Sequence, residues 1–91
     1  MPAKHVIYSG RVQGVGFRYT VRRIAAGYEV TGWVRNLEDG RVELQVMSAE
    51  AGELDAFVQA IIDSSLGGNI RDVETREIPP LAGVRGFAIV S

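Results

Sequence analysis

The chain contains no cysteine among its 91 residues, and its charges almost cancel. The lack of cysteine excludes a disulfide framework, a thiolate nucleophile and a cysteine-based zinc or iron–sulfur site. A net charge of −1 gives no general attraction to nucleic acid or to an anionic membrane, so any anion site must be local. Long apolar runs are also absent, both in residues 1–10 and later, and we therefore expect a cytoplasmic protein.

Histidine is scarce as well, because His5 is the only one. A Ser-His-Asp site would have to use it, yet the sequence has no G-x-S-x-G motif, and a lone histidine on a first strand is usually structural or exposed. The carboxylates Glu38 and Asp39 lie in a predicted turn without partner histidines. The sequence therefore predicts neither a metal site nor a cofactor.

The composition that remains is typical of a small globular protein. Apolar residues make up 46% and charged residues 23% of the chain. A chain of this length buries about 60–65% of its unfolded surface when it folds as one unit. We expect a single domain over residues 1–91, and a monomer.

The most informative stretch is Gly10–Arg18, with the sequence Gly-Arg-Val-Gln-Gly-Val-Gly-Phe-Arg. Glycines allow consecutive backbone N–H groups to approach an oxyanion, and Arg18 falls where a helix should begin. A dinucleotide fingerprint would need glycine where Tyr19 stands, and a Walker loop would need a lysine that is missing. The stretch favours a phosphate pocket, although an ordinary turn with a solvated Arg18 explains the glycines equally well.

A second segment decides between these alternatives. Gly10–Arg18 matches G-x-V-Q-G-V-x-F-R, and Gly32–Val42 matches G-W-V-x-N-x-x-x-G-x-V. Together these segments resemble the two signatures of the acylphosphatase family. The chain departs from the family pattern at Tyr8, at Ser48 and at residues 67–69, where Gly-Gly-Asn replaces a common Gly-Pro. The departures affect local turns more than the predicted chemistry.

Hydrophobic periodicity predicts the order of the elements. Strand patterns cover 5–10, 29–36, 42–46, 70–78 and 87–90, and helical patterns cover 17–26 and the segment between Ser48, the expected N-cap, and Gly67-Gly68. The expected buried stripe of the second helix is Leu54, Phe57, Val58, Ile61 and Ile62. The order β-α-β-β-α-β with a short fifth strand predicts an α+β, ferredoxin-like sandwich with an antiparallel sheet and two helices on one face. Acylphosphatases share this plan.

The resemblance implies a metal-independent hydrolase of acyl phosphates, with inorganic phosphate as a product. It implies catalytic roles for Arg18, which binds phosphate, and for Asn36, which positions the attacking water; from its position alone, Asn36 is better explained as a turn residue. The implied phosphate-binding loop comprises Gln13, Gly14, Val15, Gly16, Phe17 and Arg18. Surface exposure is the default expectation for Arg11, Arg35 and Arg41.

Three other function classes remain open. An acylphosphatase-like domain also begins the hydrogenase-maturation carbamoyltransferases, where it serves carbamoyl phosphate chemistry. An RNA-binding domain of ferredoxin-like fold would need aromatic residues on its central strands, which residues 41–47 lack. A regulatory module could bind an anion at the same loop without turnover. We expect no nucleic-acid or membrane partner, only a small-molecule acyl phosphate.

Overall fold

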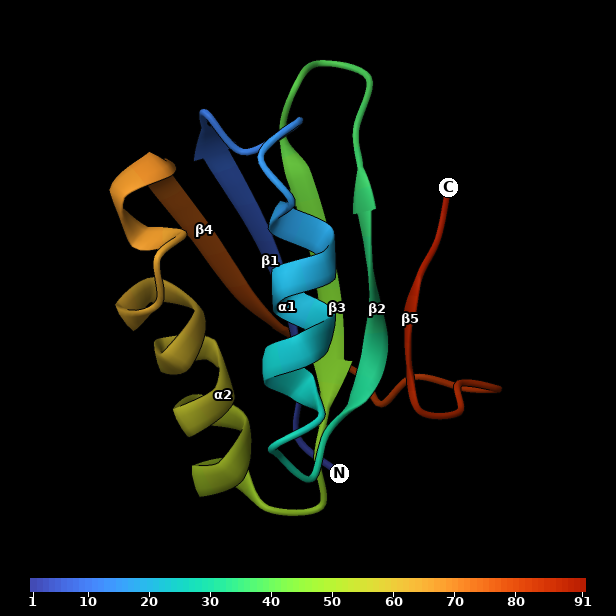
Figure 1. The fold of residues 1–91 in the computed structure, drawn as a ribbon. Coiled ribbons are helices and arrows are strands. Elements are labelled where there is room, and N and C mark those ends of the chain that lie inside the picture. The colour runs from blue at the N-terminus through green and yellow to red at the C-terminus, as the bar shows by residue number, and fades with distance from the viewer.

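The computed structural model describes residues 1–91 and consists of two layers, a five-stranded sheet and two helices that cover one of its faces (Figure 1). The elements are β1 (Ala3–Gly10), α1 (Phe17–Ala25), β2 (Thr31–Asn36), β3 (Val42–Met47), α2 (Ala51–Asp63), the 3-10 helix η1 (Gly67–Asn69), β4 (Ile70–Ile78) and β5 (Phe87–Ile89). The predicted α+β, ferredoxin-like plan is confirmed. Neither helix has the length and apolar character needed to cross a lipid bilayer.

The strands are arranged in the order β4-β1-β3-β2-β5. The first four pair antiparallel, as expected. β5 instead runs parallel to β2, with Phe87 opposite Gly32 and Ile89 opposite Val34, which makes the sheet mixed. The chain leaves β4 at one edge of the sheet and reaches the opposite edge through residues 79–86, so β5 enters beside β2 in the same direction.

The core lies between the sheet and the helices. Alternation along the strands turns every second side chain toward the helices, and Val6 and Tyr8 on β1 are fully buried there. The helix α1 contributes its predicted face, with Phe17, Val21 and Ala25 buried. Because residues four positions apart lie on the same side of a helix, the buried residues occupy one side of α1 and leave its other side exposed.

The second helix differs from the prediction at its ends and at one stripe position. Ser48 is not its N-cap; the Ser48 hydroxyl donates to the Glu29 carbonyl at 2.7 Å and accepts from the Glu50 N–H, so it closes the turn before α2. The helix ends at Asp63, and Gly67 lies in η1. Leu54, Phe57 and Ile61 are buried as predicted, but Ile62 is 38% exposed because it points away from that stripe.

The sheet face opposite the helices has a partly buried polar cluster centred on Glu43. Its carboxylate lies 2.6 Å from His5 Nε2 and 2.6 Å from Arg35 Nε, and the side chains of His5 and Glu43 are only 11% and 12% exposed. Burial alone would raise the pKa of Glu43, but its hydrogen bonds with His5 and Arg35 outweigh that effect and lower the pKa. His5 is therefore a structural residue, the role the sequence favours for a lone histidine.

Replacing Glu43 with glutamine is expected to lower the free energy of unfolding at pH 7 by about 1–2 kcal/mol, because partly buried hydrogen bonds to a charged group are lost. A folded pKa held below 4.5 stabilises the fold above that pH, and this contribution is lost as the pH falls through the folded pKa. Urea unfolding should show that the difference in free energy of unfolding between the parent and the variant is smaller at pH 3 than at pH 7. Glu74→Gln, on exposed β4, is the matched control, and an equal gap at both pH values would contradict the prediction.

Candidate active site

The loop between β1 and α1 contains the glycines from which the sequence predicts an anion cradle. Gly14 and Gly16 adopt φ angles of 77° and 75°, in the left-handed region that side chains disfavour. A Cβ on either glycine would meet no neighbouring atom, so the requirement is conformational. Gly16 is also the N-cap of α1, and no side chain caps this helix end.

The backbone N–H groups of this loop are free. From Gln13 to Arg18, none of them donates to a protein acceptor; the first paired one is Thr20, whose N–H bonds the Gly16 carbonyl at 3.0 Å. The first turn of α1 has no acidic residue that could occupy this helix end. Free donors at the positive end of a helix are the standard protein binding site for phosphate.

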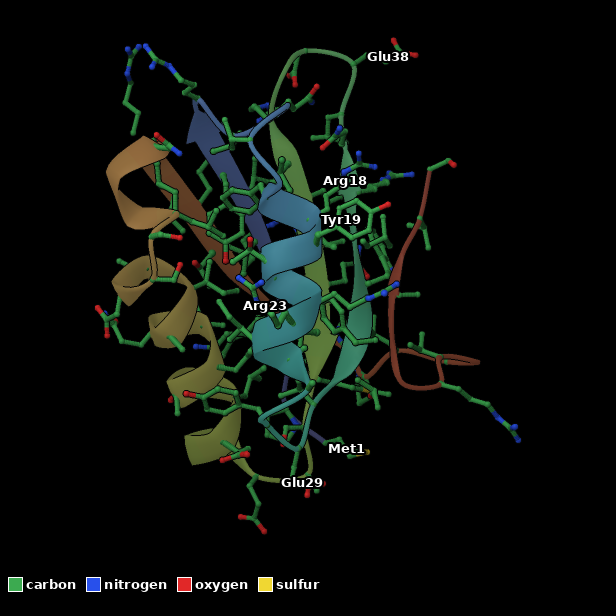
Figure 2. The ribbon with its side chains drawn as sticks, viewed as in Figure 1. Met1, Arg18, Tyr19, Arg23, Glu29 and Glu38 are labelled. Carbon is green, nitrogen blue, oxygen red and sulfur yellow. The ribbon has the colours of Figure 1, made fainter.

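Arg18 is the second residue of α1. Its side chain is half-buried and takes part in no ion pair, so the guanidinium is available to an external anion. Figure 2 shows Arg18 on the side of α1 that faces β2, and the N-terminus of α1 and the C-terminal end of β2 lie at the same end of the molecule. The fold thus brings the loop, Arg18 and the end of β2 together.

Asn36 is the last residue of β2 and pairs with Val42 on β3. Its side chain forms none of the side-chain hydrogen bonds in the structure, and its Oδ1 atom is buried without a partner. The turn after Asn36 is closed by two backbone bonds, Leu37 N–H to the Arg41 carbonyl and Gly40 N–H to the Leu37 carbonyl, and by side-chain bonds of Gln13 and Asp39. The amide of Asn36 is therefore not needed to form the turn and is free to bind another group.

The sequence predicts a role for the backbone N–H of Gln13 in the phosphate-binding loop, but it predicts no role for the Gln13 side chain. Gln13 Nε2 donates to the Leu37 carbonyl at 2.7 Å and to the Arg41 carbonyl at 2.9 Å. These bonds tie the loop to the turn that directly follows Asn36. The only signal in the sequence was the residue type. Binding through the backbone N–H would allow any side chain at this position, yet the residue is an amide.

The charged groups around the β2–β3 turn are largely paired with one another. Arg41 bonds Asp39 through its backbone N–H and its guanidinium, and the backbone bond is the main reason that the pKa of Asp39 is lowered. Arg35 bonds Glu43, while Arg11 is exposed and unpaired. No group of three or more histidine, cysteine or acidic side chains is placed to hold a metal ion.

Comparisons with known proteins match one family over most of the chain. A family model described as acylphosphatase matches residues 4–89. An acylphosphatase from Bacillus velezensis is 44% identical over 93% of this chain and 93% of its own, and one from Haloarcula marismortui is 45% identical over 93% and 91%.

Solved structures give the same result. The crystal structure of acylphosphatase from Bacillus subtilis matches with a TM-score of 0.89 and 38% identity over the whole of both chains. The HypF protein of T. kodakarensis matches with a TM-score of 0.82, but the match covers only 12% of that larger chain. The chain therefore belongs to the acylphosphatase family, enzymes that hydrolyse acyl phosphates.

Proposed function

We propose that this enzyme cleaves its acyl phosphate by direct attack of a water molecule, held by Asn36, on phosphorus. Arg18 and the amides of residues 13–18 bind the phosphoryl oxygens. The observation that best supports this proposal is the run of unpaired backbone N–H groups from Gln13 to Arg18 beside an unpaired guanidinium. Phosphoryl transfer needs such positioning and charge stabilisation more than it needs a strong base.

The roles follow from the chemistry of each group. The water oxygen forms a bond to phosphorus while the bond from phosphorus to the acyl oxygen breaks, and the carboxylate leaves with the electron pair. A substrate phosphoryl oxygen takes the proton of the water. The planar fork of Arg18 and the helix N-terminus stabilise the charge on the equatorial oxygens. The unpaired Oδ1 of Asn36 accepts a hydrogen bond from the water.

The experiment that tests the proposal is hydrolysis of benzoyl phosphate by the purified protein in excess EDTA, followed by ultraviolet absorbance. We expect turnover that chelation leaves unchanged, because Arg18 and the loop supply the positive charge that a metal would otherwise provide. Loss of activity in EDTA with recovery on adding Mg²⁺ would contradict the metal-independent mechanism. A folded protein without any turnover would instead favour an anion-binding module.

Gln13 is a positioning residue in this proposal, because its side chain fixes the loop against the turn that follows Asn36. Gln13→Leu is expected to lower kcat/KM for benzoyl phosphate about tenfold, since misplacing the loop relative to the water costs roughly 1–2 kcal/mol in the transition state. Gln45→Leu, which removes a half-buried amide without side-chain bonds, is the matched control. An unchanged kcat/KM in a folded Gln13→Leu protein would exclude the positioning role.

A further inference from the structure

The strand β4 forms one edge of the sheet, and its outer side has no hydrogen-bond partner (Figure 1). β4 pairs with β1 only, and no backbone bond outside the helices and strands involves residues 71–78. Its pairing with β1 is regular from Asp72 to Ile78, and six of its nine residues are exposed. The free N–H and C=O groups along this outer side are therefore able to pair with another strand.

The charged side chains of β4 have no ion-pair partners within the protein. None of them forms a salt bridge, and the Arg76 guanidinium has only a long contact of 3.4 Å with His5 Nδ1. Charges on an edge strand usually prevent it from pairing with other strands. The charged residues of β4, all exposed, are Arg71, Asp72, Glu74, Arg76 and Glu77.

The order of these charges is complementary to an antiparallel copy of the same strand. When two copies pair about a twofold axis at Glu74, Asp72 of one copy lies opposite Arg76 of the other. Residues directly opposite in an antiparallel pair project from the same face of the sheet, so the two opposite charges come within reach of each other. The twofold axis makes this contact occur twice.

The flanking residues extend the match. In the same register Arg71 of one copy lies opposite Glu77 of the other, again twice, and Val73 lies opposite Thr75. β-branched residues such as these pair well across strands. The register centred on Glu74 thus gives every charged residue of β4 an opposite charge except the residue on the axis.

Neighbouring registers match less well. A pair centred on Val73 places Asp72 opposite Glu74 twice, and like charges directly opposite each other are destabilising. A pair centred on Thr75 places Glu74 opposite Arg76 but leaves Asp72 without an opposite charge. The charges therefore favour the register centred on Glu74.

We propose that two copies of this chain associate through the outer side of β4, antiparallel and centred on Glu74, so that their sheets become continuous. β1 and β3 separate β4 from β2, which carries Asn36, so the dimer does not depend on the proposed function. One strand pair buries less area than a standard interface of about 1,600 Å², and we therefore expect a weak dimer with a Kd of about 0.1 mM. The monomer expected from the sequence then describes the protein only at lower concentrations.

Glu74 makes the one unfavourable contact in this dimer, because it lies opposite its own copy on the axis. Glu74→Gln removes the repulsion between the two carboxylates and is expected to lower Kd about threefold. Sedimentation equilibrium measures this change. A Kd that rises in Glu74→Gln would contradict a twofold axis at this residue.

Charge reversals at Asp72 and Arg76 test the dimer and its register together. Asp72→Arg and Arg76→Asp each place like charges opposite each other at both symmetry-related contacts. Sedimentation equilibrium is measured from about 10 µM to 1 mM protein at an ionic strength of about 0.1 M. Arg85→Asp, which changes an exposed arginine in the connection to β5, is the control for net charge. The urea midpoint of each variant checks that it is folded.

We expect each charge-reversal variant alone to have a Kd about tenfold above that of the parent. An equimolar mixture of the two variants should associate like the parent. In the mixed dimer the new positive charge at position 72 lies opposite the new negative charge at position 76, and the unchanged residues at the other contact also match. The double variant Asp72→Arg with Arg76→Asp should associate with itself for the same reason.

Three results overturn the inference. The first is a parent that stays monomeric up to about 1 mM protein. The second is a dimer that Asp72→Arg leaves intact, or that Arg85→Asp weakens as much, because either result places the contact on another surface or in another register. The third is a failure of both the mixture and the double variant to associate while the parent does.

Discussion

Replacing Arg18 with alanine is expected to lower kcat/KM for benzoyl phosphate by about 10³- to 10⁴-fold, because the cradle loses its only side-chain charge. The amides of the loop remain, so phosphate binding weakens without disappearing. Arg18 makes no ion pair in the folded protein, and its removal should therefore leave the urea midpoint nearly unchanged. Activity and inhibition by inorganic phosphate are measured on the same preparation.

Arg18→Lys separates charge from geometry at this position. A lysine keeps the positive charge but cannot form two parallel hydrogen bonds with a phosphoryl group. We expect weaker inhibition by inorganic phosphate than in the parent and a loss of kcat/KM smaller than in Arg18→Ala. Arg71→Ala, an exposed arginine without an ion pair, is the control for net charge. An unchanged inhibition constant in Arg18→Lys would contradict bidentate binding.

The second large effect is expected at Asn36. Asn36→Ala should lower kcat by two to three orders of magnitude while the inhibition constant of inorganic phosphate changes little, if positioning the water is worth about 3–4 kcal/mol. In the proposed mechanism the unpaired Oδ1 atom of Asn36 holds the attacking water, whereas Arg18 and the loop amides hold the phosphoryl oxygens, so most of the phosphate affinity does not depend on Asn36. Single-turnover and steady-state rates, together with phosphate inhibition, provide the measurement.

A structural role for Asn36 predicts a different result. If the amide mainly shaped the turn, Asn36→Ala would lower the rate and the phosphate affinity equally and would reduce the urea midpoint. The turn is closed by the Leu37–Arg41 and Gly40–Leu37 backbone bonds, so we expect no such loss of stability. Asn36→Asp provides a further contrast, because its negative charge repels the phosphoryl group and should weaken phosphate inhibition while keeping the side-chain shape.

Much of the fold follows from local sequence patterns. The strand over Ile70–Ile78 has the predicted bounds, α1 begins at Phe17 as expected, and Asn36 ends its strand. Alternation and four-residue spacing reflect which side chains share a face, and that depends only on neighbouring residues. The buried faces of β1 and α1 were predictable for this reason.

The structural predictions that were wrong or incomplete concern residues whose bonding partners lie far away in the sequence. Ser48 has the residue type of a helix cap, but its hydroxyl bonds the Glu29 carbonyl, 19 positions away. Gln13 acts on carbonyls of the β2–β3 turn, and β5 pairs with a strand more than 50 positions earlier in the chain. Such partners are selected by packing of the whole chain, which residue types alone do not specify.

The candidate site likewise has some features that local sequence determines and others that depend on tertiary packing. The sequence by itself determined the glycine loop, Arg18 in the first turn of a helix and Asn36 at a strand end, because glycine permits the loop backbone and hydrophobic periodicity fixes where the helix begins and the strand ends. Only the tertiary structure decided that the loop amides stay unpaired and that Gln13 ties the loop to the turn after Asn36. These features depend on distances between segments far apart in the chain, and those distances are fixed only when the core packs.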